Sequence, residues 1–157
     1  MKTLNKILIG GIIFLSGCNP ATHARFDLSR LELWQRDLFI EAGNYWNISI
    51  KDNKNSLNVA FLGDIKDKPK GKNQKYIAFT YNYTEEGEKK HQIIFDKKET
   101  WSDCSKVEGF LYNNPQEING YNFLKISQHE LGHFMGKGHS DNKKDVMYHQ
   151  MGKRCKN

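Results

Sequence analysis

Three of the chain's six histidines lie within eleven residues, in the stretch HELGHFMGKGH at positions 129–139. His129 and His133 are four residues apart, a spacing that places two helical side chains on the same face, one turn apart. Two imidazoles in that relation can bind one metal ion. Glu130 projects about 100° away around the helix axis and can reach the open side of the ion without binding it. The spacing therefore predicts a metal site on a helix, with a carboxylate beside it.

The third histidine can join this site only if the helix ends soon after His133. Gly136 can adopt a positive φ that turns the chain, and Gly138 adds further freedom, so that His139 can return as a third ligand. An accidental pair of histidines on a helix surface is the alternative, and it explains neither these glycines nor the third histidine. Three neutral nitrogen ligands leave the fourth tetrahedral position to water, which is typical of catalytic zinc. We predict one catalytic Zn²⁺, with Glu130 as the general base and three ligands: His129, His133 and His139.

The stretch HELGHFMGKGH resembles the zinc signature of the metzincin metallopeptidases, whose second mark is a methionine turn downstream. DVMYH at 145–149 supplies Met147, eight residues after His139. The resemblance implies that Met147 forms a floor beneath the zinc ligands without binding the metal. Among metzincins the chain is most similar to the matrixins. Residues 122–140 resemble their active-site helix, and IIFDKKETW at 93–101 resembles the segment in which their substrate-binding edge strand runs into an acidic turn.

The chain departs from the matrixin pattern in several places. It has no PRCGxPD-type cysteine switch, so zymogen control of the matrixin kind is not expected. The acidic turn reads DKKE at 96–99, which argues against a family-type calcium site. Only His23 and His91 remain upstream as ligands for a second, structural zinc, and we expect His91 and His149 to be surface residues. Tyr148 directly follows the methionine and receives no catalytic role.

Hydrophobic periodicity predicts two helices. A first helix is expected over 28–46, with Ser29 and Glu32 forming a capping box at its start. The helix that carries the metal site is expected to run from about Asn122, whose side chain can cap it, to Met135. The buried face of the first helix is expected to comprise Leu31, Trp34, Leu38, Ala42 and Tyr45, and that of the second Phe123, Ile126, Leu131 and Phe134.

Between these helices the period changes to that of β-strands. β-branched and aromatic residues separated by polar turn residues predict four strands, at 48–52, 57–63, 76–83 and 92–96. Residues 97–120 show no sustained period and contain Gly109 and Pro115, so a long irregular connection is expected there. The fold class expected over residues 27–157 is α+β. The resemblance implies a metzincin-like zinc peptidase domain, with a twisted mixed β-sheet, a long N-terminal helix and an active-site helix.

Residues 1–17 have the parts of a secretory signal: two lysines, the apolar run 7–15 and small residues before Cys18. The closing LSGC resembles the bacterial lipoprotein box, which implies a lipidated Cys18, a tether over 18–26 and a place in the bacterial cell envelope, outside the cytoplasm. An uncleaved anchor or a plain secretory signal with an incidental cysteine are the alternatives. Asn19 is not the aspartate that retains many lipoproteins at the inner membrane of Gram-negative bacteria, which favours the outer membrane.

The chain has three cysteines, an awkward number for an exported protein. If Cys18 carries lipid, Cys104 and Cys155 remain as a pair. They can form a disulfide in an oxidising compartment or stay as two free thiols, because sequence alone does not place their Cα atoms.

The net charge of +6 is concentrated in the lysine run at 66–75, which is typical of a solvated loop. Such a run can attract anionic lipid or cell-wall polymer. Nucleic acid is not an expected partner, because the chain has no motif that interleaves basic and aromatic residues. The expected partners are a peptide or protein substrate and, through the N-terminal lipid, a membrane; the chain is expected to be a monomer.

The predicted function is zinc-dependent endopeptidase activity, in which Glu130 takes a proton from a metal-bound water and returns it to the departing amine. The substrate is expected to lie extended along the edge strand around Ile93–Asp96. A peptidase of cell-wall peptides is one alternative. A non-catalytic zinc-binding envelope lipoprotein is another, although a pure binding module would have no use for Glu130.

Overall fold

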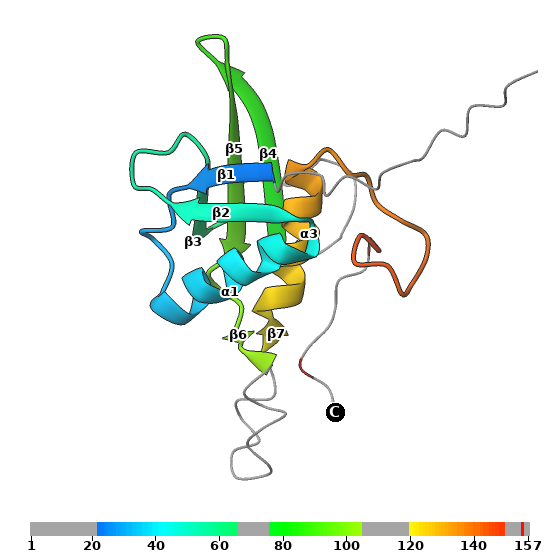
Figure 1. Ribbon diagram of the computed structural model, residues 1–157. Helices are drawn as coiled ribbons and strands as arrows, with labels where there is room; N and C mark the ends of the chain where they lie inside the picture. The colour runs from blue at the N-terminus through cyan, green and yellow to red at the C-terminus, as the bar shows by residue number, and fades with distance from the viewer. Residues whose placement is uncertain (1–21, 66–75, 105–119, 150–154, 156–157) are drawn as a thin grey trace, which may run out of the picture.

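The protein is described by a computed structural model that places residues 22–65, 76–104, 120–149 and 155 (Figure 1). The expected signal peptide at 1–17, the lipidation site Cys18 and the lysine run at 66–75 lie outside the described residues. Of the helices that the structure describes, none is long and apolar enough to cross a membrane.

The first described elements form a β-α-β unit, with β1 (Thr22–Phe26), α1 (Leu33–Tyr45) and β2 (Ile48–Asp52). β1 and β2 are parallel, and a parallel pair needs a crossover such as α1. The strand expected at 48–52 is confirmed. The tether expected at 18–26 is wrong for residues 22–26, because Ala24 and Phe26 are buried there and the backbone pairs with β2.

A mixed sheet contains β3 (Val59–Gly63), β4 (Ala78–Glu85) and β5 (Glu88–Asp96), in the order β3-β5-β4. β3 runs parallel to β5, and β4 runs antiparallel to it. A bridge between Asp27 and Val59 joins this sheet to the β1–β2 pair. The strands expected at 57–63, 76–83 and 92–96 are therefore confirmed with shifted ends, and the mixed sheet of an α+β fold is confirmed.

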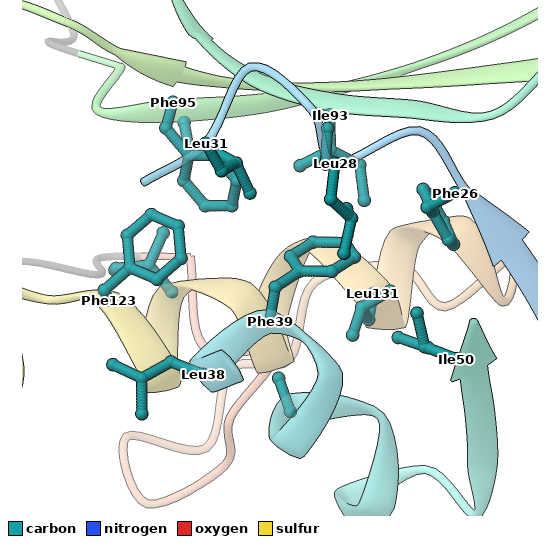
Figure 2. Packing of buried hydrophobic residues seen from close by; sticks show 14 of the residues in the cluster. Phe26, Leu28, Leu31, Leu38, Phe39, Ile50, Ile93, Phe95, Phe123 and Leu131 are labelled. Carbon is teal, nitrogen blue, oxygen red and sulfur yellow. The ribbon is translucent and has the colours of Figure 1, made fainter. Parts of the chain in front are cut away.

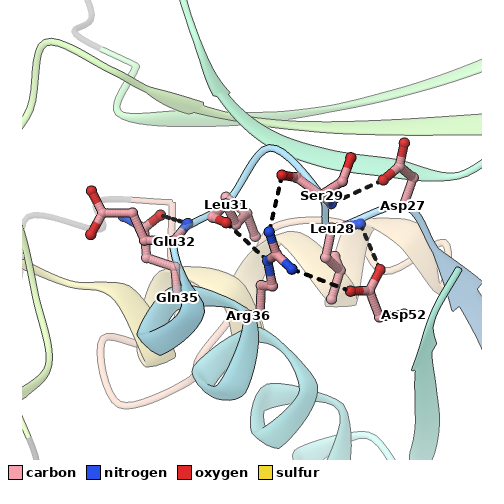
Figure 3. A network of polar contacts seen from close by, with 8 residues as sticks. All are labelled: Asp27, Leu28, Ser29, Leu31, Glu32, Gln35, Arg36 and Asp52. Atoms are coloured by element: carbon pink, nitrogen blue, oxygen red, sulfur yellow. Dashed lines mark hydrogen bonds and ion pairs between the residues drawn. The ribbon is translucent and has the colours of Figure 1, made fainter. Parts of the chain in front are cut away.

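Helix α1 begins later than its hydrophobic pattern indicates. Glu32 is the N-cap residue, and its N–H donates to Gln35 Oε1 at 3.0 Å in a capping box. Ser29, the expected cap, lies in the preceding loop, where its N–H donates to Asp27 Oδ1 at 2.9 Å and its carbonyl accepts from Arg36 Nη2 at 3.0 Å (Figure 3). The capping box expected at Ser29 and Glu32 is wrong, because the loop already uses the polar groups of Ser29.

The second half of the fold leads into the helix of the histidine motif. β6 (Trp101–Ser102) pairs in parallel with β7 (Tyr121–Asn122), and α3 (Phe123–Phe134) follows at once. Asn122 caps α3 by accepting a hydrogen bond from the Lys125 N–H at 3.0 Å. The helix expected from Asn122 to Met135 is confirmed, and most of the connection expected over 97–120 lies outside the described residues.

The hydrophobic core lies between the two helices and the sheet (Figure 2). Phe39 of α1, Phe95 of β5 and Phe123 of α3 are fully buried, with ring centroids 6.3 Å apart for Phe39 and Phe95 and 4.5 Å apart for Phe95 and Phe123. Each fully buried side chain of this size contributes roughly 1.5–3 kcal/mol to folding. The aromatic rings thus fasten both helices to the same strand.

The buried faces of the helices follow the sequence pattern with one exception in α1. Tyr45, expected inside, is 55% exposed, and Phe39 takes a central place in the core that the spacing did not assign to it. α1 packs on both α3 and β2, so its buried residues extend beyond the single stripe that the spacing assigned. The expected residues that are buried are Leu31, Leu38, Ala42, Phe123, Ile126 and Leu131.

Cys104 and Cys155, which are 51 positions apart in sequence, form a disulfide with Cα atoms 5.4 Å apart. The backbone N–H of Cys155 also donates to the carbonyl of Gly120 at 3.1 Å. The chain near its C-terminus is therefore attached both to the end of β6 and to the start of β7.

We expect the double substitution Cys104→Ser/Cys155→Ser to lower the free energy of unfolding by about 2–4 kcal/mol, because the bond closes a long loop in the unfolded chain. Urea unfolding of the variant and of the oxidised wild type measures this difference. Wild type treated with a reductant should match the variant, and an unfolding midpoint that the reductant leaves unchanged would contradict the expectation.

Ser127 lies on the buried face of α3. Among the described residues, its Oγ is a buried side-chain atom without a hydrogen-bond partner. Ser127→Ala should therefore stabilise the fold by about 1 kcal/mol, because it removes a buried hydroxyl that gains nothing from its surroundings. Urea unfolding tests this, and a loss of stability would reveal a partner for the hydroxyl.

Candidate active site

Helix α3 brings His129 and His133 together one turn apart, as their spacing predicts. Their Nε2 atoms lie 3.1 Å from each other. His129 is buried and His133 is half-buried, so the pair sits at the boundary between the core and the surface. One face of a single helix thus supplies two ring nitrogens that point at the same place.

His139 reaches the same place because α3 ends in a glycine turn. Gly136 has a φ of +78°, its N–H donates to the carbonyl of His133, and the N–H of Lys137 donates to the carbonyl of Gly132. These two hydrogen bonds form a Schellman motif, which requires the left-handed conformation that glycine adopts without strain. The turn places His139 Nε2 3.2 Å from His133 Nε2.

The rings of the first two histidines are oriented from behind by backbone carbonyls. His129 Nδ1 lies 2.7 Å from the carbonyl oxygen of Val146, and His133 Nδ1 lies 2.8 Å from that of Lys137. A carbonyl only accepts hydrogen bonds, so each Nδ1 carries the proton and each Nε2 presents its lone pair. Burial lowers the pKa of His129 to about 4 and also lowers the pKa of His139, which keeps both rings neutral at pH 7.

The arrangement of the three nitrogens fits a zinc ion. Ligand atoms of His129, His133 and His139 lie within 4.8 Å of one another. Tetrahedral coordination with Zn–N distances of about 2.0–2.1 Å separates two nitrogens by about 3.3 Å. The separations of 3.1 and 3.2 Å are close to that value. Two unprotonated nitrogens at such a distance cannot hydrogen-bond to each other, so they need a cation between them.

Glu130 is held apart from the histidine cluster, on a different side of α3. It is 5% exposed and belongs to no group of three metal-binding side chains among the described residues. Burial raises the pKa of its carboxyl group to about 7, although a hydrogen bond from Thr80 acts in the opposite direction. A carboxyl group with this pKa can both accept and release a proton near neutral pH.

Met147 lies beneath the helix, in the turn that follows the third histidine. Its carbonyl accepts from the Ser140 N–H at 2.8 Å, and its own N–H donates to Asp145 Oδ1 at 2.9 Å. The Met147 sulfur and the Trp46 ring fill the space where a side chain at Gly132 would stand. Sequence reasoning missed the role of Gly132, which lets the methionine turn approach the helix, although a glycine inside a helix is itself a signal of close packing.

Trp46 is a second residue of the site that sequence reasoning missed. Its indole Nε1–H donates to the carbonyl of Gln128 at 2.7 Å, and its ring packs against the core. This side chain comes from the end of α1, so it ties the first helix to the residue that precedes the histidine motif.

The other histidines do not join the cluster. His149 is exposed, with its ring centroid 6.5 Å from that of His139. His91 is half-buried rather than on the surface as expected, because its ring packs on Phe134 with a centroid distance of 4.6 Å and its Nδ1 lies 2.7 Å from Asn82 Oδ1. Neither His91 nor His149 is part of a group that could hold a metal ion among the described residues.

The turn that was unfavourable for calcium contains internal cations instead. Lys97 Nζ lies 2.8 Å and Lys98 Nζ 3.7 Å from the carboxylate oxygens of Asp64, at the end of β3. Two ammonium groups thus lie beside the carboxylate of Asp64, next to the DKKE turn.

The edge strand expected around Ile93–Asp96 is wrong. These residues belong to β5, which pairs with β3 on one side and with β4 on the other, so its backbone groups are already used. The outer strands of this sheet, among the residues that the structure describes, are β3 and β4. β3 is bridged to the chain after β1 through Val59 and Asp27, so β4 is the strand with the open edge. β4 also contacts the active-site helix directly, because Thr80 Oγ1 lies 2.6 Å from Glu130 Oε2.

Comparison with known proteins agrees with this geometry. Matrilysin of Rattus norvegicus is 43% identical over 54 residues and matrilysin of Homo sapiens is 41% identical over 54 residues. Each alignment covers 34% of this chain but 16% of the matrilysin, so the chain spans only a small part of these relatives. A family model described as Matrixin matches residues 29–157, which is most of the chain. On the strength of that match, this chain belongs to the matrixin family.

Proposed function

We propose that this protein is a zinc-dependent endopeptidase. The matrixin family is zinc-dependent. The observation that carries the proposal is a buried Glu130 on the same helix as two of the three converging histidines. A zinc ion bound there supplies a Lewis acid, which acidifies a water and polarises the scissile carbonyl. Glu130 then accepts the proton of the attacking water and gives it to the departing amine, and the carbonyl contacts of His129 and His133 keep their Nε2 lone pairs available.

The substrate in this proposal lies extended along the open edge of β4. Glu86 and Gly87, both with positive φ, form the two-residue turn of the β4–β5 hairpin. The residues that flank this turn, Glu85 and Glu88, are therefore a hydrogen-bonded pair. From there, hydrogen-bonded and non-hydrogen-bonded pairs alternate along the two strands. The hydrogen bond of 2.8 Å from the Asp96 N–H to the Ile77 carbonyl has the same phase. The residues of β4 whose N–H and C=O groups point away from β5 are therefore Ala78, Thr80, Asn82 and Thr84.

A peptide can add to this edge as one more strand. Main-chain hydrogen bonds then hold the substrate through groups that every peptide shares, so the cleft binds many sequences and leaves preference to side-chain pockets. Because Thr80 also contacts α3, a peptide paired with β4 lies next to the helix that carries Glu130.

We further propose that the enzyme is lipid-anchored at Cys18 in the bacterial cell envelope, with the outer membrane as the favoured site in a Gram-negative host. The support is the sequence alone: the two lysines, the apolar run at 7–15 and the LSGC box. A lipid tether raises the concentration of the enzyme near other surface proteins, so the anchor itself would select substrates.

Glu130→Gln should lower the rate of peptide cleavage by about 100-fold or more, because the variant has no group that accepts the proton. The zinc-loaded full-length chain in detergent is incubated with an unbiased peptide library, and the cuts are read by mass spectrometry. Glu41→Gln on the exposed surface of α1 is the matched control and should leave the cuts unchanged. If wild type and Glu130→Gln both bind one zinc and neither cuts, the chain is a binding module and the proposal fails.

The buried Glu130 also predicts how the metal-free protein responds to pH. The pKa of its carboxyl group is about 7 in the fold against a usual value of 4.5, so the folded state holds the extra proton between these values and stability falls as pH rises through them. Glu130→Gln lacks this effect. In the presence of a chelator it should be more stable than wild type by up to about 3 kcal/mol at pH 8, and equally stable near pH 4.

Urea unfolding of both proteins at pH 8, 6 and 4 measures this difference. His129 acts in the opposite sense, because its pKa is lowered to about 4 and stability falls as pH drops from 6.5 towards that value. That loss is common to wild type and variant and cancels in the comparison. A stability difference that does not change with pH would show that Glu130 is not held in its protonated form.

A further inference from the structure

Thr80 is the residue through which the edge strand contacts the active-site helix at Glu130. Its Oγ1 donates to Glu130 Oε2 at 2.6 Å and lies 3.2 Å from the backbone carbonyl oxygen of the same residue. Thr80 stands opposite Ile93, a fully buried residue of β5, so its side chain is on the face of the sheet that packs against α3. The two residues are 50 positions apart in sequence, and the contact depends on the folded sheet.

Thr80 differs from the neighbouring residues of β4 because its backbone faces the open edge while its side chain hydrogen-bonds to Glu130. Its N–H and C=O point towards the open edge, as the hairpin register requires. Ala78 has the same backbone orientation but no polar side chain. Asn82, also in that phase, has its side chain engaged with His91. Thr80 therefore combines a backbone free for strand addition with a hydroxyl on the carboxylate.

A carboxylate at the end of a glutamate side chain rotates easily, because its last torsion has no sharp minimum. A hydroxyl bonded to one oxygen removes that freedom, and in a buried place such a hydrogen bond is strong. With Oε2 engaged by Thr80, Oε1 is the oxygen left to exchange a proton. The hydroxyl thus selects both the rotamer and the reactive oxygen of Glu130.

We propose that Thr80 is a positioning residue for the peptidase reaction. Its hydroxyl orients the Glu130 carboxylate, and its main chain binds the peptide whose cleavage Glu130 assists as a general base. The inference rests on the proposed endopeptidase function. It implies that the place of the peptide and the orientation of the base are set by the same residue, so the hydroxyl should affect turnover more than peptide binding.

The test compares Thr80→Val, which keeps the shape and loses the hydroxyl, with Thr80→Ser, which keeps the hydroxyl. The zinc-loaded full-length chain in detergent is assayed on a peptide that the wild type cuts. We expect Thr80→Val to lower kcat about 10-fold with KM within about twofold, and Thr80→Ser to restore most of kcat. In the Glu130→Gln background, Thr80→Val should cause no further loss, because the carboxylate that it orients is gone.

Thr22→Val on β1 is the matched control, because Thr22 is an exposed threonine in a strand outside the edge of β4 that binds the peptide in this proposal. It should leave kcat unchanged. Zinc content and the thermal midpoint of each variant separate positioning from damage to the fold. If Thr80 were only structural, loss of its hydroxyl would lower both values or raise KM. The inference is overturned if Thr80→Val keeps the wild-type kcat, or if Thr80→Ser is as slow as Thr80→Val. If the wild type cuts no peptide at all, the proposed function fails first, which is a distinct result.

Discussion

The close approach of three histidine ring nitrogens, of which those of His129 and His133 are unprotonated, is the constraint on which the rest of this structure depends. Ligand atoms of the three histidines lie within 4.8 Å of one another, and lone pairs at that distance repel unless a cation lies among them. Two of the rings cannot turn away, because carbonyls of Val146 and Lys137 hold their Nδ1 atoms. The end of α3 at Gly136 and the return of the chain towards Met147 are therefore requirements of the site as much as features of the fold.

The helix that bears these histidines is held rigid by packing on several sides. Phe123 and Leu131 anchor it in the core, while Gly132 lets Trp46 and Met147 lie against its backbone. This packing also buries Glu130, whose ionised form costs up to about 3 kcal/mol there. A single buried aromatic side chain contributes roughly 1.5–3 kcal/mol, so one or two of the core rings offset that cost. The core is thus what allows the fold to bury the carboxyl group of Glu130.

Local spacing predicted the parts of the site that lie within one helix and its end. The cap at Asn122, the ligand pair and the glycine turn follow from contacts between residues a few positions apart, which a sequence displays directly. Contacts between distant segments could not be found in this way. The bond from Thr80 to Glu130 and the packing of Trp46 on α3 depend on strand register and on the docking of α1. The cap expected at Ser29 failed for a different, local reason, since the nearby Asp27 and Arg36 engage the polar groups of Ser29 in the loop before α1.

The misplaced edge strand is different, because the sequence did contain a signal against it. IIF in β5 is an unbroken apolar run, which is typical of a strand covered by neighbours on both sides and packed in the core. β4 instead becomes steadily more polar towards its end, in TYNYTE, and its last residues are exposed. Polar and charged residues are how natural sheets keep an unpaired edge from joining another chain. Under the proposed function, substrate binding by strand addition requires such an edge to stay open, so the polar strand was the better place to expect it.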